Sequence, residues 1–134
     1  MKKEAVQSRA IYPARGYSHA VRTGPIVWTA GIVAQDAEGN IVGRGDIAVQ
    51  TEQVFQNVKT VLESMGLGME DVVKITIFAT SVLFRPVIMA ARSKYFQADP
   101  PASTFFVVSS LSTPDQLVEM EVVAVTDGQP GRVE

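Results

Sequence analysis

The chain has 134 residues, of which 46% are hydrophobic and 19% charged, and its net charge is -2, so it has the composition of an ordinary globular domain with one core. It contains no cysteine and one histidine, which excludes a disulfide framework, a thiolate nucleophile, a zinc–thiolate site and a multi-histidine metal site. Because no Lys/Arg block marks a nucleic-acid surface and no apolar run is long enough for a signal peptide or a membrane span, we expect one cytoplasmic domain over residues 1–134, with no metal, cofactor, nucleic-acid or membrane partner.

The first half of the chain predicts two strands followed by a helix. HAVRTGPIVWTAGIV (19–33) is typical of two short strands around a turn at residues 23–25, and DAEGN (36–40) is typical of a second turn. After Asp46 the apolar residues recur at helical spacing, at Val54, Val58, Val61, Leu62 and Met65. With Asp46 as the N-cap and Gly66 as the stop, this pattern predicts a helix over roughly residues 46–65.

The second half predicts three strands and one more helix. The β-branched stretch VVKITIFAT (72–80) is typical of a strand. Pro86 suits the first turn of a helix that extends to about Phe96, and Ile88, Ala91 and Tyr95 share its inner face. STFFVVSSL (103–111) and LVEMEVVAV (117–125) predict the last two strands, and the tail TDGQPGRVE (126–134), rich in Gly and Pro, is expected to fray.

The order of these elements, β-β-α-β-α-β-β, predicts an α+β fold with a mixed β-sheet and both helices packed on one face. The strands KITIFA (74–79) and STFFVV (103–108) carry apolar residues on both faces, which is expected only when both faces are buried. Two helices cover one face. We therefore expect the other face to pack against further copies of the chain.

The last predicted strand carries two acids among apolar residues, Glu119 and Glu121. Side chains two positions apart on a strand share a face, and burial of an unpaired carboxylate is costly. We therefore expect both acids where a core strand borders a wet cleft between subunits, with mutual repulsion raising the pKa of one of them. The structural alternatives are a hydrogen bond to backbone or solvent for Glu119 and a salt bridge, the favoured role, for Glu121.

Six stretches of the sequence form a recognisable set: GYSHAV (16–21), VWTAGIVAQDAEGNIVG (27–43), QTEQVFQNVKTVLESMGLGMEDVVKITIFAT (50–80), YF (95–96), PPAST (100–104) and LVEMEVVAV (117–125). In this order and spacing they resemble the RidA family, also called YjgF/YER057c/UK114, over nearly the whole chain. The resemblance implies a chorismate-mutase-like α+β fold and a homotrimer with sheets inward and helices outward. It also implies a small-molecule ligand between subunits and the hydrolysis of enamines and imines, such as 2-aminoacrylate, to ketoacids and ammonia.

The resemblance also implies the residues of the site. Glu119 matches the glutamate that positions the attacking water, and Tyr17 and the backbone of Gly31 match substrate-binding positions. The arginine that holds the substrate carboxylate in this family is replaced by Ser103, and Thr104 follows it. Because serine offers one neutral hydroxyl in place of a charged planar fork, we expect Ser103 and Thr104 either to hydrogen-bond a polar substrate or to form cross-strand hydroxyl hydrogen bonds. We expect an imino acid to bind more weakly by about one to two orders of magnitude.

Other residues and functions remain open alternatives. One arginine elsewhere could replace the missing guanidinium, and the candidates are Arg15, Arg22, Arg85 and Arg92. His19 and Phe84 are candidate cleft walls, although a lone histidine is more often a structural hydrogen-bonding residue. The alternative to a deaminase is a non-catalytic small-molecule-binding or regulatory trimer of the same fold. The acidic balance argues against a ribonuclease.

Overall fold

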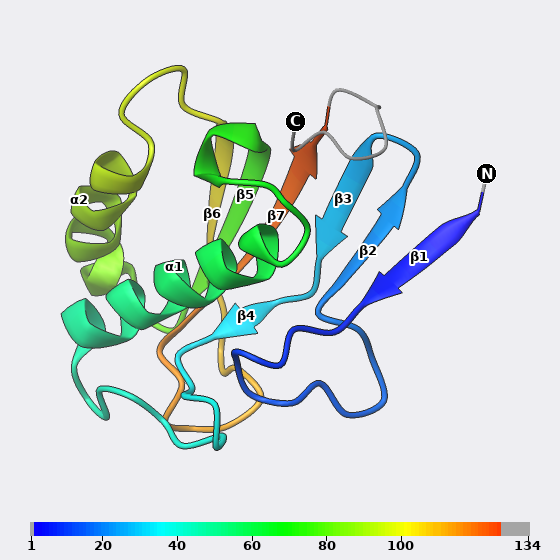
Figure 1. Ribbon diagram of the computed structural model, residues 1–134. Coiled ribbons are helices and arrows are strands. Elements are labelled where there is room, and N and C mark those ends of the chain that lie inside the picture. The colour runs from blue at the N-terminus through cyan, green and yellow to red at the C-terminus, as the bar shows by residue number, and fades with distance from the viewer. Residues whose placement is uncertain (1, 127–134) are drawn as a thin grey trace.

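Seven strands form one mixed sheet, and two α-helices lie against one of its faces (Figure 1). The computed structural model describes residues 2–126, so the tail that is expected to fray lies outside the described residues apart from Thr126. The helices are α1 Ile47–Glu63 and α2 Arg85–Tyr95, and η1 Met69–Asp71 and η2 Val82–Phe84 are short 3₁₀ turns. The strands are β1 Lys3–Val6, β2 Ala20–Thr23, β3 Ile26–Thr29, β4 Ile32–Val33, β5 Val72–Ala79, β6 Ala102–Val107 and β7 Val118–Val125.

The sheet has the strand order β1-β2-β3-β7-β5-β6, and β4 also pairs with β7. β5 and β6 run parallel and are joined through α2, whereas the other pairs are antiparallel. The predicted α+β fold, with a mixed sheet and both helices on one face, is confirmed. Two strands add to the predicted order: β1 is a charged edge strand (KEAV) without apolar alternation, and β4 has two residues.

β3 and β4 together form one interrupted strand along β7. β3 pairs with the end of β7 and β4 with its beginning, where Val33 lies opposite Glu119. Across the gap, the hydroxyl oxygen of Thr29 accepts a hydrogen bond from the Val122 N–H at 3.0 Å. The interruption therefore leaves Ala30 and Gly31 beside the first half of β7, and this break positions the candidate site.

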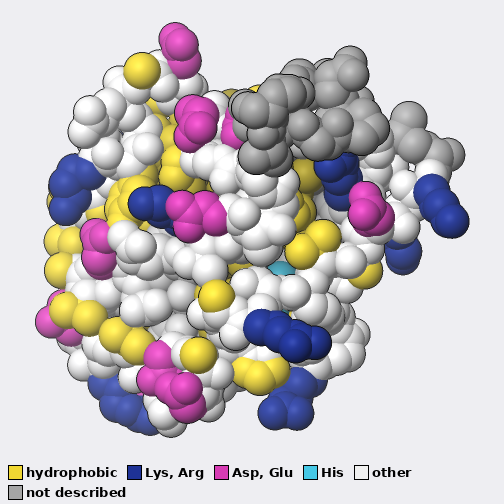
Figure 2. All heavy atoms as spheres, viewed as in Figure 1, with side chains coloured by type: hydrophobic (Ala, Val, Ile, Leu, Met, Phe, Trp, Pro, Cys, Tyr) yellow, Lys and Arg dark blue, Asp and Glu magenta, His cyan; other side chains and the backbone are white. Residues whose placement is uncertain are grey.

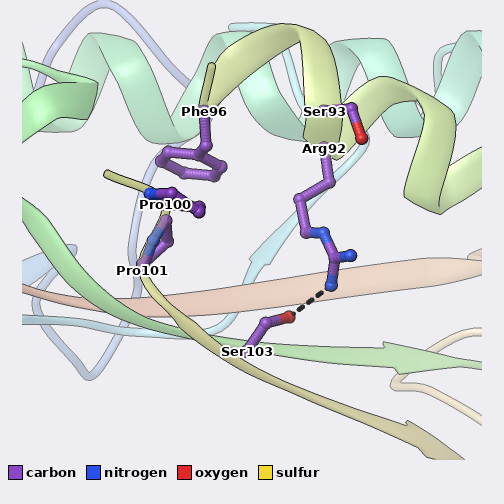
Figure 3. A pocket seen from close by; sticks show the side chains of 6 residues that line it. All are labelled: Arg92, Ser93, Phe96, Pro100, Pro101 and Ser103. Carbon is purple, nitrogen blue, oxygen red and sulfur yellow. Dashed lines mark hydrogen bonds between the residues drawn. The ribbon is translucent and has the colours of Figure 1, made fainter. Parts of the chain in front are cut away.

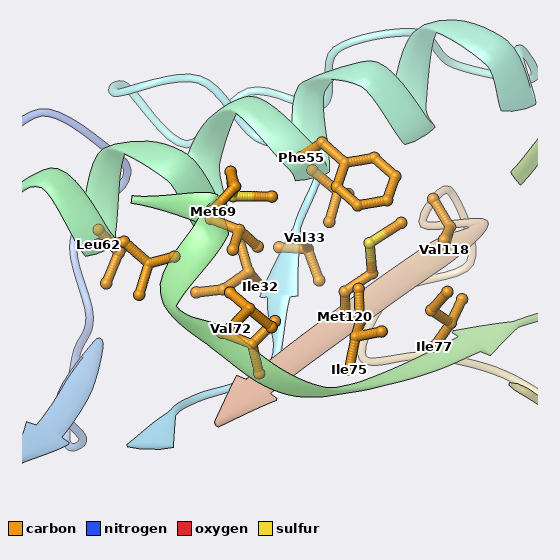
Figure 4. Packing of buried hydrophobic residues seen from close by; sticks show 14 of the residues in the cluster. Ile32, Val33, Phe55, Leu62, Met69, Val72, Ile75, Ile77, Val118 and Met120 are labelled. Atoms are coloured by element: carbon orange, nitrogen blue, oxygen red, sulfur yellow. The ribbon is translucent and has the colours of Figure 1, made fainter. Parts of the chain in front are cut away.

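Helix α1 supplies most of the core on the covered face of the sheet. The Asp46 carboxylate caps its N-terminus by accepting the Val49 N–H at 3.1 Å, and Gly66, with φ of +74°, follows its C-terminus. Both predicted ends are confirmed within two residues. Figure 4 shows the inner side chains of this helix facing the sheet, among them Phe55 and Leu62 over Ile75, Ile77 and Met120.

Helix α2 begins one residue before Pro86 and ends at Tyr95, as predicted to within a residue. Its buried side chains are Ile88 and Ala91, and the Tyr95 ring stacks on Phe55 of α1 with ring centroids 4.5 Å apart. None of the helices within residues 2–126 is long and apolar enough to cross a bilayer.

The two faces of the sheet differ in cover. Figure 2 shows the helix-bearing face, where acidic and basic side chains are interspersed. On β7, Val118, Met120 and Val122 are buried beneath the helices, so Glu119 and Glu121 point to the helix-free face. Beside these acids the helix-free face carries apolar side chains, with Trp28 48% and Phe106 52% exposed and with Phe78 and Val123 half-buried.

Candidate functional site

Glu119 lies near the start of β7 on the helix-free face, and its side chain is half-buried. Gly31 sits directly against it, because a Cβ atom added to Gly31 would overlap the Glu119 carboxylate. The break between β3 and β4 creates this close approach. The sequence brings these two predicted residues together through pairing of distant segments, in agreement with their proposed common site.

Two tyrosines stand close to the Glu119 carboxylate. Tyr17 is 45% exposed, and its pKa is raised mainly by partial burial and further by the negative charge of Glu119. Tyr12 is buried, and its hydroxyl accepts a hydrogen bond from the Val33 N–H at 2.9 Å, at the β4 residue that pairs with Glu119. The pKa of Tyr12 is also raised, mainly by burial and further by Tyr17 and Glu119. Tyr12 is a member of this cluster that the sequence analysis missed; its only signal was its position five residues before Tyr17.

His19 is buried and contacts both tyrosines. Its ring is 1% exposed, and its Nδ1 accepts a hydrogen bond from the Ser8 N–H at 3.0 Å, so the proton lies on Nε2, which donates to the Tyr12 carbonyl at 2.8 Å. The ring packs edge-on against both Tyr12 and Tyr17. In the single chain His19 therefore anchors the loop that carries the tyrosines, which is the structural hydrogen-bonding role expected of a lone histidine.

The electrostatic environment raises the pKa of Glu119. Burial is the largest cause, and repulsion from Glu121 adds to it, as the shared face of the two acids predicts. Within residues 2–126 the Glu119 carboxylate forms no hydrogen bond and no ion pair, and Glu121 is exposed and likewise outside any salt bridge there. The carboxylate of Glu119 therefore keeps its lone pairs available for a water molecule or a ligand.

Ser103 and Thr104 point to opposite faces of the sheet. Thr104 lies on the helix-free face, where its hydroxyl accepts a hydrogen bond from Lys74 Nζ at 2.6 Å. Ser103 pairs in register with the buried Ile75 and faces the helices. Its hydroxyl accepts a hydrogen bond from Arg92 Nη1 of α2 at 2.8 Å. Within one chain, Ser103 and Glu119 therefore do not meet.

Phe84 and three of the four candidate arginines make contacts with groups other than Glu119. Phe84, half-buried at the start of α2, packs against the core on the helix side. Among the candidate arginines, Arg22 donates to the Gly24 carbonyl and Arg85 lies over the Phe105 ring, whereas Arg92 reaches Ser103. No group of three or more potential metal-binding side chains occurs in the described part of the chain.

Comparison with known proteins places this fold among related chains. Residues 7–126 match the family model described as Endoribonuclease L-PSP. A RutC family protein from Pyrococcus abyssi is 34% identical over 125 residues, which are 92% of this chain and 98% of that protein. A protein from Dermatophagoides farinae named 2-iminobutanoate/2-iminopropanoate deaminase is 32% identical over 115 residues, 86% of this chain and 89% of that protein.

Solved structures show the same architecture. A putative endoribonuclease from Thermotoga maritima is 35% identical and superposes with a TM-score of 0.88, covering 96% of this chain and 100% of that one. The YjgF gene product of E. coli is 28% identical with a TM-score of 0.84, covering 91% of this chain and 98% of that one.

Proposed function

The chain belongs to the RidA (YjgF/YER057c/UK114) family, and from that premise we propose that it hydrolyses a small enamine or imine to a carbonyl compound and ammonia. The observation that carries the proposal is the Glu119 carboxylate, half-buried, without a hydrogen-bond partner within residues 2–126, and set against Gly31 beside Tyr17. One relative bears the name of an imine deaminase, which agrees with this chemistry.

In the proposed reaction Glu119 holds a water molecule and accepts its proton as the oxygen attacks the C=N carbon. A C–O bond forms, the C=N double bond becomes a single bond, and the nitrogen takes up a proton. The C–N bond then breaks as the hydroxyl loses its proton to form the carbonyl group, and ammonia leaves. The raised pKa of Glu119 suits this role, because a weaker acid is a stronger base and can return the proton to the leaving amine. Tyr17 and the Gly31 backbone orient the substrate.

The proposal includes a homotrimer in which three copies pack with their sheets inward. Supporting it, the helix-free face carries an exposed aromatic row, in which the Phe78 and Phe106 rings stack with centroids 6.0 Å apart. In such an assembly the ligand lies between subunits, and Ser103 and Thr104 of one copy approach Glu119 of another. Because Ser103 and Glu119 are on opposite faces of one chain, this shared site requires a second copy.

The test compares Glu119→Gln with Glu121→Gln. Imines such as 2-iminobutanoate are generated in situ, and ammonia release is followed with and without protein. We expect Glu119→Gln to reduce the protein-dependent rate by about 10²–10⁴-fold, the usual worth of a general base. Glu121→Gln removes the same charge from the same face, two residues along β7, and should retain most of the activity. Equal rates for wild type and Glu119→Gln would remove Glu119 from the mechanism.

A second function has one observation in its favour, the neutral Ser103 at the position where the resemblance implies a carboxylate-binding arginine. A non-catalytic binding or regulatory trimer would show saturable binding of a small molecule without ammonia release, or would change the activity of a partner enzyme. The description Endoribonuclease L-PSP belongs to the family model, and the net charge of -2 continues to argue against nucleic acid as the ligand of this chain.

A further inference from the structure

A pocket of about 310 Å³ lies in the loop that leads from β1 to β2, and we call it the N-terminal pocket. Its floor includes the buried residues Ser8, Ile11 and His19, and Arg9 is exposed at its rim. Figure 2 shows part of the imidazole, in cyan, recessed in the helix-bearing face. The pocket therefore opens on the face opposite to the one to which Glu119 points.

The N-terminal pocket is separate from the residues of the proposed function. Among the described residues, its lining does not include Tyr17, Gly31 or Glu119. Figure 3 shows a different pocket, of about 250 Å³ between α2 and β6, in which Arg92 lies above Ser103. The two pockets share no lining residue within residues 2–126.

Hydrogen bonds inside the loop fix the shape of the N-terminal pocket. Gln7 Nε2 donates to the Tyr17 carbonyl at 2.8 Å, and the Ser8 N–H donates to His19 Nδ1 at 3.0 Å. His19 Nε2 donates in turn to the Tyr12 carbonyl at 2.8 Å, so both ring nitrogens have partners and the imidazole offers a ligand only its carbon atoms. The pocket is therefore largely preformed, and its polar contacts must come from other side chains.

Two hydrogen-bond donors at this pocket have no acceptor within residues 2–126. The Ser8 hydroxyl oxygen accepts from the Ala10 N–H at 3.3 Å, and no described group accepts its proton, although Ser8 is only 7% exposed. The Arg9 guanidinium forms neither an ion pair nor a hydrogen bond there. No acidic side chain is among the described residues that line the pocket. A guanidinium next to a hydroxyl donor fits the two oxygens of a carboxylate.

The rest of the lining is apolar. Ile11, Pro13, Ala14 and Ala37 line the pocket beside the two donors. This wall fits a short aliphatic chain, and the volume is at the lower end of the roughly 300–1,000 Å³ of small-molecule sites.

We propose that the N-terminal pocket binds the carboxylate of a small aliphatic acid, with Arg9 and Ser8 as the donors and Ile11 against the chain. No residue of the proposed reaction lines this pocket within residues 2–126, so the proposal stands whether or not Glu119 is catalytic. Binding is therefore measured without turnover.

The experiment titrates the intact protein with butanoate, acetate and butanamide, and follows the backbone amide resonances by NMR. We expect butanoate to shift the Ser8, Ile11 and His19 amides in a saturable manner. Acetate lacks two methylene groups and should bind roughly tenfold more weakly. Butanamide has the shape of butanoate without its charge, and it should leave these amides unchanged.

Three variants test the donors. Arg9→Gln should weaken butanoate binding at least about tenfold, and Ser8→Ala should weaken it less, because a charge-assisted hydrogen bond is stronger than a neutral one. Arg15→Gln is the matched control: it removes the same charge from an exposed position of the same loop but does not line the pocket, and it should bind within twofold of wild type.

Four results would overturn the proposal. These are the absence of saturable shifts at the three amides with butanoate, equal shifts with butanamide, equal affinity for acetate, and unchanged affinity in Arg9→Gln. Because Arg9 is exposed, its substitution should leave the amide resonances outside the pocket in place. The comparison of the three probes requires no variant and tests the proposal even if a substitution impairs folding.

Discussion

The close approach of Gly31 to Glu119 provides a substitution that should separate activity from stability. In Gly31→Ala the new Cβ would lie 2.7 Å from Glu119 Cδ, whereas carbon atoms in contact normally lie about 3.5–4.0 Å apart. The carboxylate must therefore move by about 1 Å. The nearest atoms all belong to the Glu119 side chain, which can rotate away, so the backbone has no need to shift.

Gly31→Ala should affect the rate of hydrolysis far more than it affects stability. A displacement of about 1 Å in a catalytic group costs on the order of 10²-fold in rate, so we expect a loss of that order in imine hydrolysis. Stability should change little or rise, because replacing glycine by alanine at a compatible backbone angle restricts the unfolded chain and stabilises by about 0.4–1 kcal/mol. Gly31 is not among the described glycines that have positive φ angles, so alanine can adopt its conformation.

The assay measures ammonia release and urea unfolding for wild type, Gly31→Ala and the control Gly68→Ala. In the control the added Cβ would likewise overlap the end of a glutamate side chain, that of Glu70, at a φ of -131° and far from β7 along the chain. We expect the control to keep full activity. If Gly31→Ala were fully active, or if it lost activity only in proportion to unfolding, Glu119 would not need its observed position and the reasoning would fail.

Two further predictions concern charge and assembly. Because the pKa of Glu119 is higher in the folded than in the unfolded protein, the folded state binds the proton more tightly and loses stability as the pH rises through the carboxyl range. In urea unfolding, Glu119→Gln should therefore be more stable than wild type at pH 7, and the difference should disappear at acid pH. A variant less stable than wild type at pH 7 would contradict the direction of the pKa shift. The substitution Trp28→Asp places a charge on the helix-free face and should dissociate the proposed trimer in sedimentation experiments at micromolar concentration. The control Val49→Asp changes a residue on α1 that is 42% exposed, and it should leave the trimer intact. A wild-type protein that sediments as a monomer would contradict the proposed assembly.

Local patterns made most of the fold predictable from the sequence. The α1 boundaries follow from helical spacing and a capping aspartate, which act within a few residues of each other. β1 was not predictable in this way, because its four residues are largely polar and pair with β2 only after a long loop. β4 was hidden for a similar reason, since two residues carry no periodicity and the strand exists only through its pairing with β7.

In the candidate site, too, local patterns predict some features, whereas others depend on how distant segments pack. Strand alternation alone placed Glu119 and Glu121 on one face, and the structure confirms this together with the resulting repulsion. The same rule places Ser103 and Thr104 on opposite faces, although the resemblance alone had suggested a shared role in one cleft. The contact between Arg92 and Ser103 depends on how α2 packs over β6, and no spacing in the sequence indicates which arginine would arrive there.

The positions of Glu119 and Ser103 decide how one ligand could use both. β5 separates β6 from β7, so the backbones of these two strands lie roughly 10 Å apart, and the side chains of Ser103 and Glu119 leave the sheet on opposite faces. A small molecule held at Ser103 cannot reach around the sheet to Glu119 of its own chain. A ligand held at Ser103 can meet a catalytic Glu119 only if the β6 edge of one copy lies against the helix-free face of another. If imine hydrolysis is observed and Trp28→Asp abolishes it while the separated subunits stay folded, the two residues act on one substrate across a subunit boundary.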